Sequence, residues 1–444
     1  MKFKIPKSYL KILIMLLVMF ALGVGVGQKF IETNQNKPQA SFEKNTSEAF
    51  ISEIYDKIKE NYWNNIPDAE LLDLFRLSID KLSLQSADLG LTGNIDLAKF
   101  ESKEKLLKTI NKSTANMDED QKNKFLVSTV GAVLNSLTPK GRSGLFTEKQ
   151  EAQLKNTVSN INPDKDLYKD LGLAKGASES AVKKAYQTQA AKLADDESPE
   201  AKEKLNQISY AKDTLTQEDT KQRYDQNQVE PTIFAKIVSP HILYVQFKKF
   251  SPTSLEEFQK AFDVYKDQQE LNALIFDLRG NIGGAIDATA YFLGFFLGKG
   301  QYAFDFYHKG EYLPFKTATD KLASLLKYKQ IVVLVDQNSK SSAETITASL
   351  KKYHAGVVVG TTTKGWGTVE RVFPLDNQIS QKEKYSLFLV HSITLRDDNQ
   401  PIEGRGVDPD IDIKDPAWSE ELLLYFNNPA LIDAVKALVQ QKPI

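Results

Sequence analysis

The sequence contains no cysteine, which excludes disulfide bonds, thiol catalysis and cysteine-ligated metals, although it does not fix the redox compartment. It has only four histidines, His241, His308, His354 and His391, and no two of them stand at the spacing of a metal-binding motif. We therefore expect no metal site. The net charge is −1, so the basic surface that nucleic-acid binding requires is missing, and we expect no nucleic-acid partner.

What the N-terminus does have is an uncharged apolar run at residues 12–27, after a lysine-rich start and before a polar stretch. This is the layout of a secretory signal or a signal anchor. The run is slightly short for a membrane span of about 20 residues, but residues 9–27 together reach that length. We expect residues 1–30 to be an uncleaved, single-pass anchor in the cell membrane, with the body of the protein extracytoplasmic. Cleavage after residue 27 would instead give a secreted protein.

The 444 residues suggest several domains. Residues 31–48 are polar and are expected to form a linker, and residues 49–162 show a helical pattern. Four apolar side chains there follow each other at four-residue spacing: Phe50, Ile54, Ile58 and Tyr62. Residues 137–154 predict a loop and then a helix that Thr147 caps. Nothing in this region carries chemistry, so we expect a scaffold or an arm that forms a homodimer.

Residues 163–228 form a charged unit with three predicted amphipathic helices, at about 178–193, 198–215 and 217–226. The opening DLYKDLGL, the segment VKKAYQTQAAK and the ending ISYAKDTLTQEDTKQRYDQ resemble the J-domain, a co-chaperone module. The family's His-Pro-Asp loop is replaced by Ala194, Asp195 and Asp196. We therefore expect a J-like fold that serves packing or docking, without stimulation of an Hsp70 partner.

From residue 229 to residue 444, short predicted strands and helices alternate. This alternation predicts an α/β core with a mixed sheet and flanking helices. The core follows the all-α N-terminal region and the J-like domain. The expected strands are 242–250, 272–280, 330–337 and 355–363, and the expected helices are 254–268, 285–300 and 342–354.

Three hydroxyl side chains gather where a predicted strand gives way to a predicted helix: Ser339, Ser341 and Ser342. One interpretation is helix capping, because a serine at a helix start accepts a hydrogen bond from a free backbone N–H and Glu344 suits the helix dipole. The other is a nucleophile, since free N–H groups at such a turn stabilise an oxyanion. These residues alone leave both interpretations open.

Four motifs occur in a fixed order between residues 231 and 413: LIFDLRGNIGGAID, VVLVDQNSKSSAETITASL, VVVGTTTKGWGTVE and PIEGRGVDPDI. Together they resemble the tail-specific or C-terminal processing peptidases of family S41, which are serine peptidases with a Ser-Lys dyad. The resemblance implies an endopeptidase that cuts near the unstructured C-termini of protein or peptide substrates, through an acyl-enzyme and without a cofactor. The family's usual PDZ domain is not recognisable, and the J-like unit stands in its place.

Carried over position by position, the resemblance assigns roles to individual residues. Ser341 falls on the nucleophile, and Glu344 falls on the family's acidic residue one helical turn later. The backbone N–H groups of Gly283, with Gly284 as an alternative, and of Ser342 fall on the oxyanion hole. In this interpretation the Ser341 hydroxyl attacks a substrate carbonyl.

The general base breaks the pattern, because Trp366 stands where the family has its lysine and an indole N–H cannot accept a proton. Three interpretations remain. Lys364, two residues earlier, supplies the amine from a displaced position. A histidine, His391 or His354, acts together with Glu344. Or the chain is a catalytically inactive peptide-binding scaffold or adaptor.

Overall fold

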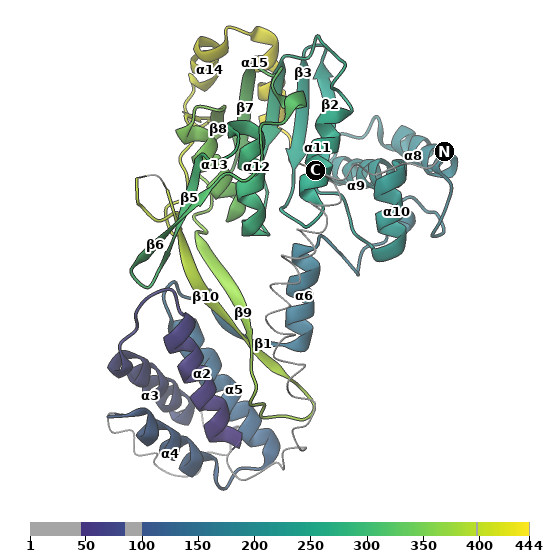
Figure 1. Cartoon of the computed structure of the whole chain (residues 1–444). Helices are drawn as coiled ribbons and strands as arrows, with labels where there is room; N and C mark the ends of the chain where they lie inside the picture. Colours follow the sequence, from purple (N-terminus) through teal and green to yellow (C-terminus); the bar gives the residue numbers. More distant parts are fainter. Residues whose placement is uncertain (1–45, 85–99, 397, 444) are drawn as a thin grey trace, which may run out of the picture.

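A computed structural model describes residues 46–84, 100–396 and 398–443. The expected anchor and nearly all of the expected linker lie outside these residues. Within the described ranges, no helix is both long and apolar enough to cross a bilayer. Figure 1 shows a helical region at one end, a long β-ribbon in the middle and an α/β core at the other end, with a smaller helical domain beside the core.

Among the described residues of the N-terminal region, four helices share one apolar core with the β-ribbon. They are α2 (Thr46–Asn61), α3 (Asp68–Leu84), α4 (Lys103–Thr114) and α5 (Glu119–Ser136). The predicted spacing on α2 is confirmed, because Phe50, Ile54 and Ile58 have no exposed surface. They share a core with Leu387 and Leu389 of the ribbon. Dimerisation through this region stays a prediction.

One strand in this region was not predicted. Residues expected to form a loop contain β1 (Gly144–Thr147), which pairs antiparallel with residues 385–388 of β10 (Tyr385–Leu395). The reason is tertiary, since the partner strand lies more than two hundred positions later in the chain. The helix that follows is confirmed as α6 (Glu148–Val158), and Thr147 caps it through its side-chain bond to the Gln150 N–H.

The J-like unit consists of four helices around its own small core. They are α7 (Leu167–Asp170), α8 (Glu179–Leu193), α9 (Pro199–Leu215) and α10 (Glu218–Asn227), and the last three lie within a residue of the predicted bounds. Ion pairs of α10 with α11 (Ser254–Asp263) attach this unit to the core: Arg223 to Glu256 at 2.9 Å and Asp219 to Lys260 at 2.5 Å.

The core contains a sheet of six strands in the order β11-β8-β7-β4-β3-β2, in which only β2 runs antiparallel. Its strands are β2 (Ile233–Ser239), β3 (Ile242–Phe247), β4 (Ala273–Asp277), β7 (Gln330–Val335), β8 (Val357–Gly360) and β11 (Ile411–Asp412). Helices α11, α12 (Thr289–Leu297) and α13 (Ser342–Lys352) cover one face. Helices α14 (Trp418–Phe426) and α15 (Pro429–Val439) cover the other. The predicted α/β class with a mixed sheet is confirmed.

A second sheet links the core to the helical region. It contains β1, β10, β5 (Tyr302–His308) and β6 (Glu311–Lys316), and β9 (Thr368–Pro374) pairs with β10 to form the long ribbon of Figure 1. The ribbon starts beside the core and ends against α2 and α5, so both parts of the molecule share it.

Two expected helices are several residues shorter than predicted, and the helix expected over 342–354 ends two residues early, as α13 at Lys352. The helix expected over 254–268 ends as α11 at Asp263, because the next residues form tight turns whose carbonyls accept hydrogen bonds from the Lys327 amine. The helix expected over 285–300 begins with a 3₁₀ turn, Ile286–Ala288, before α12.

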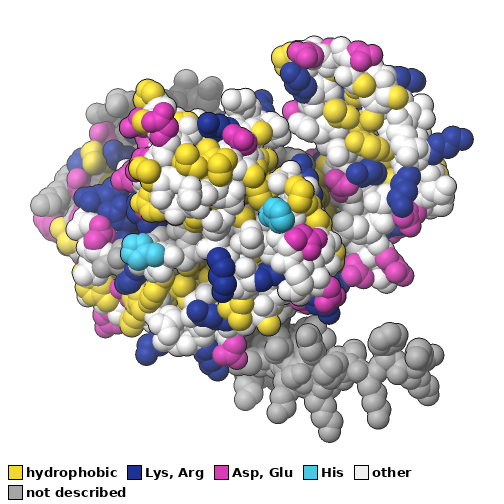
Figure 2. All heavy atoms as spheres, turned by 90° about the horizontal axis from the view of Figure 1, so that it is seen from above, with side chains coloured by type: hydrophobic (Ala, Val, Ile, Leu, Met, Phe, Trp, Pro, Cys, Tyr) yellow, Lys and Arg dark blue, Asp and Glu magenta, His cyan; other side chains and the backbone are white. Residues whose placement is uncertain are grey.

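The loops after β4 and β7 lie at one edge of the six-stranded sheet. Because β4 and β7 are parallel neighbours, the loops that leave their carboxyl ends emerge together, at the edge where α/β proteins bind ligands. On the surface seen from above, charged side chains of both signs are interspersed with apolar ones (Figure 2).

Candidate active site

The loop after β7 is fixed by its own polar side chains. Ser339 is fully buried and donates its hydroxyl to the Leu278 carbonyl at 2.9 Å, while the Asp336 carboxylate accepts the Gly280 N–H at 2.9 Å. The Lys340 N–H donates to the Asn281 carbonyl at 2.8 Å. These bonds join the two loops at the edge of the sheet. Ser339 therefore supports the loop and does not point to the solvent.

Ser341 is the N-cap of α13 but has a backbone conformation that a cap does not need, with φ 55° and ψ −122°. The other serine and aspartate caps are extended: φ is −155° at Ser102, −68° at Asp118 and −60° at Ser198. A residue with a side chain in such a sparsely populated region costs about 1–3 kcal/mol, and this strain concentrates at functional sites. Capping alone does not explain Ser341.

The glycine turn after β4 touches the serine directly. A Cβ atom on Gly283, whose φ is 81°, would lie 2.6 Å from the Ser341 Cβ and 3.1 Å from its Oγ. Only glycine permits this approach. In this conformation the Gly283 N–H donates to the Asn281 Oδ1 at 2.8 Å, so the expected role of Gly283 as oxyanion donor stays a prediction. Within the described part of the chain, the N–H groups of Gly284 and Ser342 have no acceptor, so they are the available donors.

Glu344 connects the serine to the turn that replaces the family's lysine turn. Its side chain is fully buried, and one oxygen accepts the Ser341 N–H and the Trp366 N–H, both at 2.8 Å. The other accepts the Gly365 N–H and the Thr363 hydroxyl, both at 2.6 Å. Burial raises the pKa of Glu344, and these hydrogen bonds oppose the shift. The carboxylate is a structural support that holds both halves of the site.

Trp366 is fixed by aromatic and polar contacts. Its indole N–H donates to the Glu370 Oε1 at 3.3 Å, the Arg142 guanidinium lies 3.5 Å from its ring centre, and the Lys340 amine lies 5.6 Å from it. Burial raises the pKa of the Glu370 carboxyl, which also accepts the Thr368 hydroxyl at 2.6 Å. The residue at the family's lysine position is therefore a hydrogen-bond donor that is already occupied.

Lys364 is anchored by its backbone and exposed at its side chain. Its N–H donates to the Ser339 carbonyl at 3.0 Å, so its backbone lies beside the loop that carries Ser341. No hydrogen bond or ion pair holds its amine to any residue that the structure describes. The displaced lysine is thus close in the fold and has a flexible four-carbon stem.

The two candidate histidines do not join Glu344. His354 follows α13 at its far end, and the 11 residues of that helix put its two ends roughly 16 Å apart. His391 stacks on His308 with 4.3 Å between ring centres and shares a hydrogen bond of 2.8 Å with the Ser392 hydroxyl. Burial lowers the pKa of His391 to about 4, which makes it a weak base. The four partners of Glu344 include no histidine, so the Ser-His-Glu arrangement is not formed.

Three residues that contact Trp366 or the turn around it were not assigned from the sequence: Arg142, Glu370 and Glu403, whose carboxylate accepts the Gly367 N–H. The last two lie inside motifs that carry the resemblance, and Glu370 closes KGWGTVE, so a role for each was open to inference. Arg142 gives no local signal, because it belongs to the N-terminal helical region. In the described ranges, no group of three or more His, Asp or Glu side chains is placed to hold a metal.

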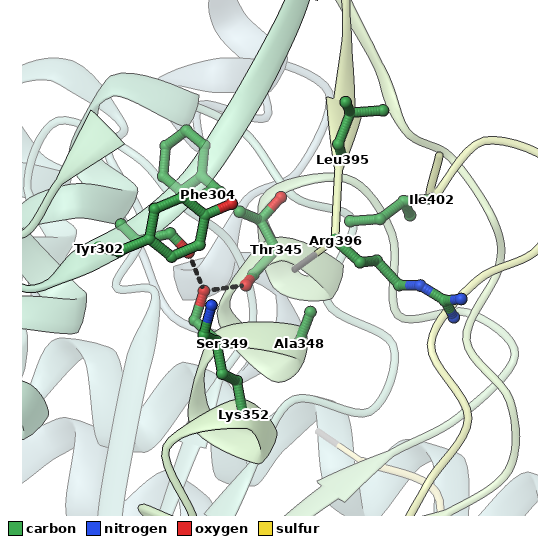
Figure 3. Close-up of a pocket in the computed structure, with 10 residues that line it drawn as sticks. Tyr302, Phe304, Thr345, Ala348, Ser349, Lys352, Leu395, Arg396 and Ile402 are labelled. Carbon is green, nitrogen blue, oxygen red and sulfur yellow. Dashed lines mark hydrogen bonds between the residues drawn. The ribbon is translucent and has the colours of Figure 1, made fainter. Parts of the chain in front are cut away.

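A pocket lies between α13, β5 and β10 (Figure 3). Thr345, next to Glu344, lines it with a buried hydroxyl, and the Ser349 hydroxyl closes one wall through bonds to the carbonyls of Ala303 and Thr345. Lys352 and Arg396 also line this pocket. Neither Ser341 nor Trp366 lines it, so it is separate from the space around the nucleophile.

Comparisons with known proteins agree with the resemblance. Residues 241–413 match the model of peptidase family S41, and residues 166–225 match that of the DnaJ domain. The carboxy-terminal processing protease CtpB of Bacillus subtilis (strain 168) is 28% identical over 207 residues, 46% of this chain and 41% of that protein. A carboxy-terminal-processing protease of Bartonella bacilliformis is 26% identical over 183 residues, 40% of either chain. The chain spans about two fifths of the length of these relatives.

Among solved structures, a photosystem II D1 C-terminal processing protease aligns over 84% of this chain and 94% of that chain, with 13% identity and a TM-score of 0.49. The segment that matches the S41 model contains the glycine turn, Ser341 and Glu344. The chain therefore combines a segment similar to the DnaJ domain, residues 166–225, with a segment similar to peptidase family S41, residues 241–413.

Proposed function

We propose that this protein is a serine endopeptidase of the C-terminal processing class, with Ser341 as its nucleophile. The observation that carries the proposal is the strained backbone of Ser341, in van der Waals contact with Gly283 and next to the unoccupied N–H groups of Gly284 and Ser342. A fixed hydroxyl beside two free donors suits attack on a carbonyl whose oxygen becomes negative.

Lys364 is the proposed base. Its neutral amine takes the proton of the Ser341 hydroxyl as the oxygen attacks the peptide carbonyl, and two backbone N–H groups stabilise the oxyanion. When the C–N bond breaks, the proton passes to the leaving amine and an acyl-enzyme remains on Ser341. A water molecule, deprotonated by the same amine, then releases the new C-terminus. Glu344 keeps the nucleophile and the turn that carries Lys364 at a fixed separation.

The substrates are proteins or peptides with unstructured C-termini. The names of the relatives describe carboxy-terminal processing, and an extended segment presents its carbonyls to the oxyanion donors when it pairs along a sheet edge. The proposed setting is extracytoplasmic, with residues 1–30 as a membrane anchor, on the strength of the lysine-rich start and the apolar run.

A second candidate is a catalytically inactive scaffold that holds such tails without cutting them. One observation favours it: the indole N–H of Trp366 is bonded to Glu370 and cannot accept a proton. In that case the glycine turn and the free donors bind peptide, and the DnaJ domain serves docking.

Cleavage assays separate the two. The full chain in detergent is incubated with an unfolded protein, alongside Ser341→Ala, Lys364→Met and, as a matched control, Lys340→Met, which removes another amine near Trp366. The proposal predicts cleavage by the parent and the control, none by Ser341→Ala, and about 100-fold slower cleavage by Lys364→Met. Cleavage by no variant, with peptide binding retained, supports the scaffold instead. Full cleavage by Lys364→Met refutes Lys364 as the base.

A further inference from the structure

Arg142 belongs to the N-terminal helical region but touches the active-site turn. It lies in the loop between α5 and β1, and its guanidinium stacks on the Trp366 ring with 3.5 Å to the ring centre. The same side chain pairs with Glu403, with its Nη2 and Nε at 3.1 and 3.3 Å from one carboxylate oxygen. Both side chains of this pair are mostly buried, with 18% and 15% of their surface exposed. The contact is therefore more than a surface ion pair.

Two carboxylates hold the backbone of residues 364–367, which we call the lysine turn. Glu344 accepts the N–H groups of Gly365 and Trp366 from inside the core. Glu403 accepts the Gly367 N–H at 2.8 Å, and the Gly404 N–H donates to the Gly365 carbonyl at 2.9 Å. Arg142 binds Glu403 and covers Trp366, so it closes the turn from the side that Glu344 does not reach.

The loop that carries Arg142 is itself well anchored. The Ser143 hydroxyl accepts the Val390 N–H of β10 at 3.2 Å, and the Thr138 carbonyl accepts bonds from the Tyr62 hydroxyl and from the Trp63 indole N–H. Since the two residues that follow α2 and the strand β10 both contribute, Arg142 is placed by the packing of the helical region on the ribbon. A shift of that region relative to the core moves the guanidinium against the lysine turn.

We propose that Arg142 is a positioning residue for catalysis, so that the N-terminal helical region completes the active site of the S41 core. Arg142 acts through Trp366 and Glu403 and fixes the lysine turn, which carries the base. The tryptophan that replaces the family's lysine is then a stacking platform for this arginine. This inference rests on the proposed function, because it assigns a role in the reaction of Ser341 and Lys364.

The test compares variants of the full chain in one loop. Arg142→Met removes the charge and the planar stack, Arg142→Lys keeps the charge only, and Lys140→Met removes an exposed charge two residues away. Two properties are measured: kcat and KM on a peptide substrate, and amide hydrogen exchange in residues 363–367. A misplacement of about 1 Å is enough for a roughly 100-fold loss of rate.

The proposal predicts that Arg142→Met lowers kcat about 100-fold, leaves KM within about twofold and accelerates exchange in the lysine turn. Arg142→Lys recovers part of kcat, and Lys140→Met behaves like the parent. An unchanged kcat in a folded Arg142→Met variant overturns the proposal, and so does a loss that appears only in KM.

An inactive parent chain refutes the proposed function and is distinct from either result. The contact of Arg142 with the lysine turn is then tested by amide hydrogen exchange alone, and unchanged exchange in Arg142→Met overturns the positioning role as well. Should Arg142→Met fail to fold, as judged by circular dichroism, Arg142→Lys carries the same comparison, because its amine cannot reproduce the two-atom contact with Glu403.

Discussion

The two halves of the active site are held in place in different ways. The nucleophile loop, residues 336–341, is fixed by neighbours in the same sheet edge, through Ser339, Asp336 and the turn after β4. The lysine turn is fixed by residues from three distant parts of the chain, Glu344, Glu403 and Arg142. The nucleophile loop, which has local support, keeps the residues of the family's motif. The lysine turn, which has distant support, has a tryptophan where the family has its lysine. Of the three supports of the lysine turn, Arg142 is the one that lies outside residues 241–413, the segment that matches the S41 model.

The largest expected effect is at the nucleophile. Ser341→Ala removes the attacking oxygen, and we expect cleavage to fall by roughly 1,000-fold or more. Initial rates on the unfolded substrate measure it, and Gln337→Ala, which changes an exposed side chain in the same loop, is the control. A rate that Ser341→Ala leaves intact contradicts the assignment of the whole nucleophile half.

The close approach of the glycine turn gives the next largest effect. Gly283→Ala introduces a Cβ 2.6 Å from that of Ser341, so we expect cleavage to fall about 100-fold, together with a loss of stability of about 1–3 kcal/mol. Gly300 has nearly the same φ, 83°, and open space around it, so Gly300→Ala shares the backbone strain without the clash.

Comparing the two glycine variants in urea unfolding and in cleavage separates strain from contact. Both variants should lose stability, and only Gly283→Ala should lose activity. Equal losses of activity would show that Gly283 serves the turn and not the serine.

The base half is tested by restoring the family's residue. In Trp366→Lys we expect the new amine to take over from Lys364. Lys364→Met should then lower the rate of cleavage about 100-fold in the parent chain, and less than about tenfold in the Trp366→Lys background. Recovery is incomplete, because Arg142 repels a second cation at this position. Steady-state cleavage of one peptide by the four chains measures the coupling, and equal costs in the two backgrounds would mean that the two lysines act independently.

The smallest effect lies outside the site, at His391. Its folded pKa of about 4 is below the ordinary value of 6.5, so it stabilises the fold above pH 6.5, and this contribution is lost as the pH falls to 4. We expect the loss to be about 2–3 kcal/mol. His391→Gln removes this part of the acid sensitivity and leaves kcat within about twofold. Urea unfolding at pH 7 and pH 4.5 measures it, with the exposed His241→Gln as the control, and a large loss of kcat would restore His391 as a candidate base.

The sequence predicted the parts of the fold that local patterns determine. The helices of the J-like unit follow their caps, Ser178 and Ser198, and the expected bounds match within a residue. The strand β1 was missed because its four residues are stabilised by β10 and not by their own pattern. Local sequence also does not show how long α11 is, since the Lys327 amine determines the conformation of the residues after Asp263.

The same division applies to the site. The contact of Ser341 with the glycine turn follows from motifs that are adjacent in the sheet, so the resemblance located it. Which glycine donates to the oxyanion depends on where the Asn281 side chain points, and no spacing in the sequence shows that. Arg142 reaches the lysine turn from a region without any motif, and only the tertiary packing reveals the contact.

The most direct test of the central claim is intact-mass and peptide mass spectrometry of the full chain after exposure to a fluorophosphonate probe. The account predicts a single adduct on the oxygen of Ser341 in the parent chain, slower formation in Lys364→Met and Arg142→Met, and no adduct in Ser341→Ala. A folded parent chain that stays unmodified, or an adduct on a serine other than Ser341, would contradict it.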